Sequence, residues 1–397
     1  MSRPFLERCP RRHLVIHMDI NKTILQVDPA GSRSMEDILN SNAADNVYGY
    51  VDSSGEWKAL YGPREAKSQT FPHTVSSDNI VTYAAFIDQK YSEPGIMQTL
   101  SPSERSAKWA EISSLRRAAT GRFTTPNSIG CRYAYMVEEQ RQCLKLNSGD
   151  GYHSIVPSFF NLINLLSNLD WSFTLIFRTF GSDLPKVLEE WQQFVQGTHE
   201  CKPEGSVLRR MSENIVTPRT GCMYRDHEEM YLCLGPSLSA STIRSLDLAK
   251  ITHPNNVAII TELKKLPNCH SVRQTNLHEL NSHLIEYFAQ SNNVGGLVDY
   301  YPAWAQAAER RCAGKVFPIP FSKRGEGVNY YVFFDDNIFI GNDRSIVDLR
   351  DEHTMKSLIG STSERPFCIP VNAYEAITNE DYFIDCLSER LKDQLNI

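Results

Sequence analysis

Apolar residues along this chain gather in short, dense runs, a pattern that predicts strands buried inside a sheet. In the run 171–177, apolar and β-favouring residues follow one another without alternation, which is typical of a strand covered on both faces. The clearest predicted strands are 13–18, 171–177 and 330–334, and a shorter one is predicted at 294–299. Polar side chains follow the three clearest strands at once, so each of these strands has a sharp carboxyl end.

Helical spacing of apolar positions appears between these strands. In the segment 183–196, apolar residues recur three and four positions apart, and Ser182 or Asp183 is placed to cap the helix. Other helices are predicted at about 103–119, 155–169 and 276–290, through 304–308 and at 379–394, and a hairpin at about 222–234. Because strand, glycine-containing turn and helix succeed one another, the predicted fold class is α/β with a parallel sheet.

The segment 28–152 differs in character from the rest of the chain. It is polar and rich in turn residues, and the one helix that stands out in it is that at 103–119. We therefore expect an inserted module here, within a discontinuous core of residues 1–27 and 153–397. A further elaboration of the core is expected at about 200–290, where the pattern is weaker.

Composition and charge exclude several classes of protein function. The 397 residues include 41 Lys and Arg against 47 Asp and Glu, a formal charge of −6, which argues against broad binding to nucleic acid or to an anionic membrane. No run of about 18 apolar residues occurs, so no membrane span is predicted. The ten cysteines form no Cys-x-x-Cys pair and are expected to be reduced thiols of a cytoplasmic protein. No glycine motif of serine hydrolases, nucleotide kinases or dinucleotide-binding enzymes appears.

The polar residues at the strand ends have the chemistry of a phosphate site. Parallel strands end at the same edge of a sheet, so side chains far apart in the sequence are expected to converge there. The residues concerned are Asp19, Asn21, Thr179, Asp335 and Asp336. Three carboxylates with a backbone carbonyl form an oxygen-rich cage suited to Mg²⁺. An aspartate beside such a cation can act as a nucleophile and form an aspartyl-phosphate, while a threonine, amides and a lysine hold the phosphoryl oxygens.

Three motifs carry a resemblance to a known family: His17-Met-Asp19-Ile-Asn21-Lys-Thr23, Phe173-Thr-Leu-Ile-Phe-Arg-Thr179 and Val332-Phe-Phe-Asp335-Asp336-Asn337. In these motifs the chain resembles the haloacid-dehalogenase-like (HAD) superfamily of Asp-nucleophile phosphatases and phosphotransferases. The resemblance implies a Rossmann-like core whose insertion, at 28–152, is a cap over the site. It implies that Asp19 is the nucleophile and a ligand of Mg²⁺. The backbone carbonyl of Asn21 and the carboxylate of Asp335 are implied as further ligands, and Asp336 as a direct or water-mediated one.

The family's third motif is a lysine that neutralises the nucleophile and the phosphate. Lys315, which precedes Asp335 by twenty residues, fits this role best, and Lys323 is the second candidate. The catalytic set implied by the resemblance is therefore Asp19, Asn21, Thr179 and Lys315.

One residue departs from the family pattern. Phosphatases of this family usually carry a second aspartate two residues after the nucleophile, as general acid and base, where this chain has Asn21. An amide preserves the carbonyl ligand and the hydrogen-bond geometry but cannot transfer a proton, and losing a general acid–base group costs about 10²–10⁴ in rate. Esters with good leaving groups, such as acyl and aryl phosphates, are expected to suffer least.

Two functions follow from these residues. The first is a Mg²⁺-dependent phosphohydrolase or phosphotransferase that acts on a phosphorylated small molecule or a phosphoprotein. The alternative is a catalytically weak or inactive pseudo-phosphatase that binds a phosphorylated ligand or partner in the same pocket. In either case, selectivity for the ligand is expected to come from residues 28–152.

Several motif residues also have purely structural interpretations. Thr179 can serve only the turn before the next helix, and Asp335 can be part of a polar strand end. Arg178 is a candidate phosphate clamp, but an arginine at a strand end more often pairs with a surface carboxylate. His17, two residues before the proposed nucleophile, is interpreted as a core histidine.

Overall fold

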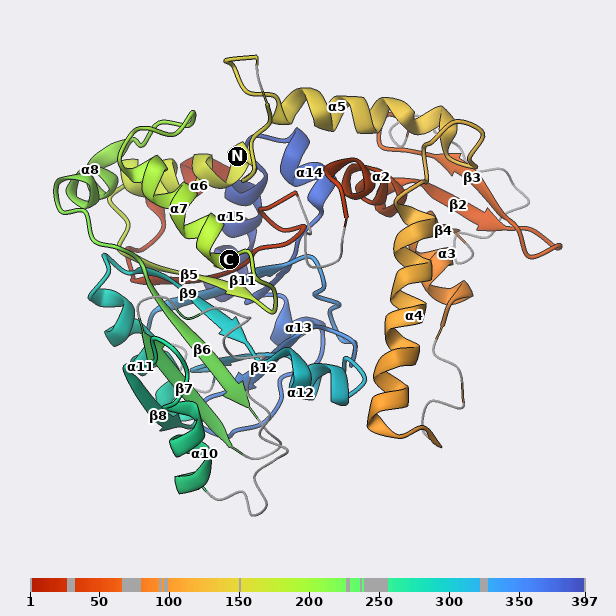
Figure 1. Ribbon diagram of the computed structural model, residues 1–397. Helices are drawn as coiled ribbons and strands as arrows, with labels where there is room; N and C mark the ends of the chain where they lie inside the picture. Colours follow the sequence, from red (N-terminus) through yellow and green to blue (C-terminus); the bar gives the residue numbers. More distant parts are fainter. Residues whose placement is uncertain are drawn as a thin grey trace. The chain divides into compact units, whose positions relative to one another are not determined.

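The residues described by the computed structural model are 2–26, 33–65, 80–92, 95, 99–149, 151–225, 229–235, 238, 256–321 and 328–395. Lys323, the second candidate for the lysine motif, lies outside them. Contacts group the chain into two units (Figure 1). Unit 1 comprises Met1–Leu25, Ile155–Val371 and Asn379–Ile397, and unit 2 comprises Gln26–Ser154 and Asn372–Thr378.

An eight-stranded sheet forms the centre of unit 1, in the order β13-β11-β1-β5-β9-β6-β7-β8. Its strands are β1 (Leu14–Asp19), β5 (Phe173–Thr179), β6 (Arg219–Arg225), β7 (Met230–Gly235), β8 (Ser271–Thr275), β9 (Val294–Asp299), β11 (Tyr330–Asp335) and β13 (Cys368–Pro370). The six strands from β13 to β6 run parallel, and β7 and β8 join by antiparallel pairing. The predicted α/β class with a mostly parallel sheet is confirmed, as are the four predicted strands and the hairpin.

The strand register places the sequence motifs beside one another. Met18 of β1 lies opposite Phe334 of β11, and Asp19 lies opposite Arg178 of β5. The carboxyl ends of β1, β5 and β11 therefore meet at one edge of the sheet.

Helices cover both faces of this sheet. Two glycines of β9 show how closely the helix side chains approach the strand. A Cβ atom on Gly295 would lie 2.2 Å from Phe288, and one on Gly296 would lie 2.3 Å from Leu184. Successive strand residues point to opposite faces, so α11, which carries Phe288, and α7, which begins with Leu184, pack on opposite sides. The helices of unit 1 are α1 (Ser2–Arg8), α6 (Pro157–Asn168), α7 (Leu184–Val195), α8 (Gly205–Glu213), α10 (Asn256–Leu263), α11 (Leu277–Ala289), α12 (Tyr301–Gln306), α13 (Ser361–Glu364) and α15 (Tyr382–Leu395), with a 3₁₀ turn at Arg311–Ala313.

A small parallel pair, β10 (Lys315–Ile319) and β12 (Val347–Asp351), adds a layer on the α11 side. Val316 and Phe317 of β10 share one buried core with Ile176 of β5 and with Leu280 and Leu284 of α11. This layer places Lys315, the first residue of β10, beside the sheet. The sequence pattern does not predict it.

Unit 2 is richer in regular structure than its sequence suggests. The predicted helix is present as α4 (Pro102–Thr120), and Ser101 begins it with a capping box. The other elements are α2 (Met35–Asn46), β2 (Tyr48–Val51), β3 (Trp57–Tyr61), β4 (Ile80–Thr82), α3 (Tyr83–Lys90), a 3₁₀ turn at Cys131–Tyr133, α5 (Ala134–Leu144) and α14 (Ala373–Thr378). The strands form an antiparallel sheet in the order β3-β2-β4.

A late segment of the chain belongs to unit 2. The stretch 372–378, which lies in the predicted core range 153–397, packs on α2 and α5. Asn372 exchanges side-chain hydrogen bonds with Asn46, and the Tyr374 hydroxyl donates to Glu139 at 2.5 Å. Unit 2 is thus formed by the insertion and by a short second segment.

Two local predictions hold only in part. Asp183 is the N-cap residue of α7, as predicted, but its carboxylate makes no capping hydrogen bond; it accepts one from Asn21 instead. The helix predicted through 304–308 ends at Gln306, because Ala308 and Glu309 adopt left-handed backbone angles, with φ of 55° and 56°. Among the described helices, none is both long and apolar enough to cross a membrane.

Candidate active site

A buried lysine joins two of the predicted carboxylates. Asp19 ends β1 and Asp335 ends the neighbouring β11, while Lys315 begins β10. The Lys315 ammonium donates to Asp19 Oδ1 and, at 2.8 Å, to Asp335 Oδ2. Asp19 is 6% exposed, and the other two residues are 1% exposed or less. Because unpaired buried charges are costly, this bridge holds all three side chains in one geometry.

The loop after β1 contacts a third carboxylate of this cluster, that of Asp336, which directly follows β11. The Thr23 hydroxyl donates to Asp19 Oδ2 at 2.9 Å and accepts from the backbone N–H of Asp336 at 3.2 Å. Lys22 has a φ of 61°, a left-handed conformation uncommon outside glycine, and its ammonium lies 3.5 Å from Asp336 Oδ2. The tight loop therefore ties the end of β1 to the end of β11.

The three carboxylates form a group that can hold a cation. One oxygen atom from each of Asp19, Asp335 and Asp336 lies within 4.8 Å of the others. Lys315 pairs with Asp19 and Asp335, and Lys22 pairs with Asp336. Hard divalent cations prefer carboxylate oxygens as ligands, so these residues fit a hard divalent cation without indicating which one.

The protonation equilibria of the cluster reflect its burial. Burial raises the pKa of Asp19 well above its usual range, the charge of Asp335 raises it further, and Lys315 opposes both. Burial acts to lower the pKa of Lys315, but the carboxylates of Asp19, Asp335 and Asp299 outweigh it and raise that pKa above its ordinary value. Lys315 is therefore a cation, and a divalent ion at the site would favour the ionised form of Asp19.

The side chains of Asn21 and Thr179 lie close together at Gly181, in the turn after β5. Thr179 Oγ1 accepts a hydrogen bond from the Gly181 N–H at 2.7 Å, so the hydroxyl serves the turn and still has its own proton to donate. Asn21 Nδ2 donates to Asp183 Oδ2 at 3.2 Å. These three side chains surround the Cα of Gly181, since a Cβ there would lie 3.2 Å from each. Asn21 Oδ1 is buried and has no hydrogen-bond partner among the described residues.

Arg178 is part of a buried network rather than a surface ion pair, which corrects the expectation from sequence. Its side chain is fully buried and makes two hydrogen bonds, of 2.9 and 2.6 Å, with the carboxylate of Asp299 at the end of β9. It also bonds to His17 Nδ1 at 2.9 Å and to the backbone carbonyl of Val316. Burial holds the pKa of His17 well below its usual range, with Arg178 adding to the effect, so the imidazole accepts from the guanidinium. His17 is indeed a core residue, packed against Phe317 and Phe333.

Replacing Asp299 by alanine is expected to destabilise the protein by about 3–5 kcal/mol, because it leaves the buried Arg178 charge without a partner. The double replacement Arg178→Met with Asp299→Leu is expected to cost less, since no charge remains to be buried. Urea unfolding of the wild type and both variants measures these differences. A single variant as stable as the wild type would contradict a tight, dry ion pair.

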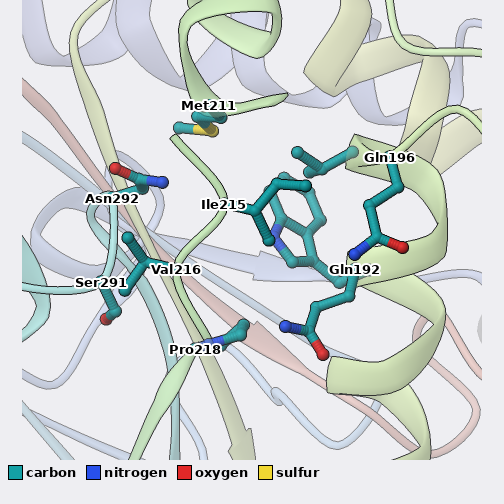
Figure 2. Close-up of a pocket in the computed structure, with 10 residues that line it drawn as sticks. Gln192, Gln196, Met211, Ile215, Val216, Pro218, Ser291 and Asn292 are labelled. Carbon is teal, nitrogen blue, oxygen red and sulfur yellow. The ribbon is translucent and has the colours of Figure 1, made fainter. Parts of the chain in front are cut away.

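The cavity in Figure 2 lies elsewhere. Gln192 of α7, Gln196 directly after that helix, Met211 of α8 and the segment around Ile215 line it, next to Asn292. Pro218 and Ser291, which also line it, precede the amino ends of β6 and β9, so it lies at the edge of the sheet opposite the carboxylates. Its volume of about 20 Å³ holds about one water molecule, which is too little for a substrate.

Comparisons of this chain with protein-family models, with curated proteins and with solved structures found no match. The structure is therefore the evidence for the site. It brings Asp19, Asp335, Asp336 and Lys315 into one cluster and places Asn21 and Thr179 together around Gly181.

The site also contains side chains that sequence reasoning overlooks. Asp299 had a usable signal, since it ends the predicted strand 294–299 as Asp19 and Asp335 end theirs. Lys22 and Asp183 had none, because their partners Asp336 and Asn21 are distant in the sequence.

Proposed function

We propose that this chain is a Mg²⁺-dependent phosphohydrolase or phosphotransferase of the HAD type, acting through an aspartyl-phosphate on Asp19. The observation that supports it most is the buried Lys315, whose ammonium joins Asp19 to Asp335 at the carboxyl ends of adjacent parallel strands. A purely structural ion pair needs one carboxylate. Here three carboxylates converge, and their oxygen atoms are ligands of the kind that a divalent cation prefers.

Each residue has a role in this proposal. The Asp19 carboxylate attacks phosphorus, and the Thr23 hydroxyl and the Lys315 ammonium hold it in place. Lys315 and the Thr179 hydroxyl, with nearby backbone amides, stabilise the phosphoryl oxygens as charge redistributes. Asp19, Asp335, Asp336 and the backbone carbonyl of Asn21 would hold Mg²⁺. When bound, the cation offsets the negative charge of the phosphoryl group.

Unit 2 corresponds in this proposal to a cap that selects the substrate. The insertion into unit 1 directly after the β1 loop is what supports this assignment. A phosphorylated small molecule and a phosphoprotein both remain substrates that the proposal accommodates.

A pseudo-phosphatase that binds phosphate without turnover is the rival function, and Asn21 is the observation that favours it. Its amide donates to Asp183, and neither group of the amide can carry a proton between water and a leaving group. Turnover of p-nitrophenyl phosphate with Mg²⁺ separates the two functions. Activity above that of the Asp19→Asn variant supports an enzyme, and phosphate binding without such activity supports the rival.

Mg²⁺ is expected to stabilise the protein, by about 2.7 kcal/mol at one hundred times its dissociation constant. Urea unfolding with and without Mg²⁺ measures this, and Asp335→Asn is expected to remove most of the effect. Asp170→Asn is the matched control: its side chain is 66% exposed, it precedes β5 at the opposite edge, and its φ of 54° suits asparagine. Equal stabilisation of wild type and Asp335→Asn would place the cation elsewhere.

A further inference from the structure

We infer that the site takes aryl phosphates, because an aromatic wall of Phe180, Tyr301 and Trp304 stands beside the lysine that holds the nucleophile. The inference rests on the proposed phosphatase function and names its substrate class. Two independent observations carry it: the position of the wall, and the presence of an amide, Asn21, two residues after the proposed nucleophile.

The wall is built into the same edge of the sheet as the carboxylates. Phe180 directly follows Thr179, and its ring centroid lies 5.5 Å from the Lys315 ammonium. Trp304 of α12 stacks on Phe180, with centroids 5.1 Å apart and ring planes 14° apart. The ring centroid of Tyr301 lies 5.9 Å from that of Phe180 and 6.1 Å from that of Trp304. Since α12 begins two residues after Asp299, the strand end and the wall are fixed together.

The wall is accessible as well as anchored. Phe180 and Trp304 are half-buried and pack on the core, and Tyr301 is 38% exposed. Large, partly exposed aromatic side chains next to a charged site are suited to contact a flat apolar group. A phenyl ring gains stacking there, whereas a linear or small leaving group gains little.

The chemistry of bond cleavage points to the same class. Asp19 forms a bond to phosphorus while the bond from phosphorus to the ester oxygen breaks, and that oxygen leaves with the electron pair. Asn21 cannot supply it with a proton. A phenol-type oxygen, with a pKa near 10, leaves far more readily as an anion than an aliphatic alcohol. The aryloxide takes a proton from solvent. Water then attacks phosphorus and gives up a proton to solvent, while the bond from phosphorus to the Asp19 oxygen breaks, which releases inorganic phosphate and regenerates the Asp19 carboxylate.

The leaving group and the ring together distinguish aryl phosphates from other classes of phosphorylated compound. An aliphatic acyl phosphate has a good leaving group but no ring to contact the wall. A nucleoside 5′-monophosphate has a ring, but its leaving group is an aliphatic alkoxide. Aryl phosphates satisfy both observations, whether as free esters or as phosphotyrosine in a peptide.

Binding of phosphonates tests the wall without any chemical step. With Mg²⁺ present, phenylphosphonate is expected to bind the full-length protein more tightly than methylphosphonate, by calorimetry. Trp304→Leu is expected to weaken phenylphosphonate binding by about 3- to 10-fold and to leave methylphosphonate unchanged. Trp304→Phe, which keeps a ring, is expected to restore most of the loss. Equal losses for both phosphonates in Trp304→Leu would overturn the inference, because a merely structural role weakens both.

Turnover completes the test and separates the two proposals. Phenyl phosphate is expected to exceed cyclohexyl phosphate in kcat/KM by about 10²-fold or more, because the missing proton donor penalises the alkoxide. Equal rates for these two esters, or turnover of adenosine monophosphate without turnover of phenyl phosphate, would overturn the inference and leave the phosphatase function intact. No turnover of any ester, with the phenylphosphonate preference retained, would reject the enzyme but keep the aryl site. A parallel assay with a phosphotyrosyl peptide distinguishes a free ester from a protein substrate.

Discussion

Replacing Asp19 by asparagine is expected to lower the rate of phosphate-ester turnover by about 10⁴-fold or more, because no other group can form the phosphoryl-enzyme. The substitution preserves the size of the side chain and a partner for the Thr23 hydroxyl. Lys315 keeps its hydrogen bond to Asp335, so its charge stays paired. A large loss of rate with little loss of structure is therefore predicted.

Single-turnover kinetics with p-nitrophenyl phosphate measure this loss, and urea unfolding checks that the variant is folded. Asp170→Asn again serves as the control, since it makes the same chemical change at an exposed position. If the Asp19→Asn variant kept a rate within tenfold of the wild type, the nucleophile would be another group or water.

Introducing a carboxylate at position 21 is expected to raise the rate on alkyl phosphates by about 10²–10⁴-fold, because it supplies the missing general acid and base. In the wild type, Asn21 Nδ2 donates to Asp183 Oδ2 at 3.2 Å. The single change Asn21→Asp sets two carboxylates against each other, whose mutual repulsion raises the pKa of one of them. The exchange of both residues, Asn21→Asp with Asp183→Asn, keeps the hydrogen bond with its direction reversed.

Rates on cyclohexyl and phenyl phosphate for both variants measure the gain. The exchanged variant is expected to gain more on the alkyl ester than on the aryl ester, since only the alkoxide needs a proton. Asp183→Asn alone is the control, because it alters the partner without adding an acid. An exchanged variant that folds and binds phenylphosphonate but gains nothing on either ester would show that proton transfer does not limit the rate.

The strands of the core were predictable because their signal is local. β1, β5, β9 and β11 are continuous apolar runs, and such runs indicate strands buried on both faces. The convergence of Asp19 and Asp335 followed from the rule that parallel strands end at one edge. These predictions needed no knowledge of packing.

Elements held by distant contacts were not predictable. The β10 strand contains Pro318 and pairs with a strand about thirty residues further along, so Lys315 could be proposed from its spacing but not placed on a strand. In unit 2, α2 buries Asn40, Asn42 and Asn46, which bond to side chains and backbone within its core. Buried amides of this kind hide the apolar periodicity by which helices are recognised.

Pairings between side chains were the hardest part of the site to anticipate. Arg178 and Asp299 lie 121 residues apart, and Asn21 and Asp183 lie 162 apart. The first pair satisfies buried charged groups and the second a partly buried amide donor, requirements that act only once the chain has folded. The sequence indicated which residues end the strands but not which of them face each other.

Trapping the phosphoryl-enzyme tests most directly whether Asp19 is the nucleophile. The protein is mixed with p-nitrophenyl phosphate and Mg²⁺, quenched in acid, digested and analysed by mass spectrometry for an added phosphoryl group. A phosphoryl group is expected on Asp19, where hydroxylamine removes it, and is expected to be missing from the Asp19→Asn variant. A phosphoryl group on another residue, or continued turnover by the Asp19→Asn variant, would contradict that role of Asp19.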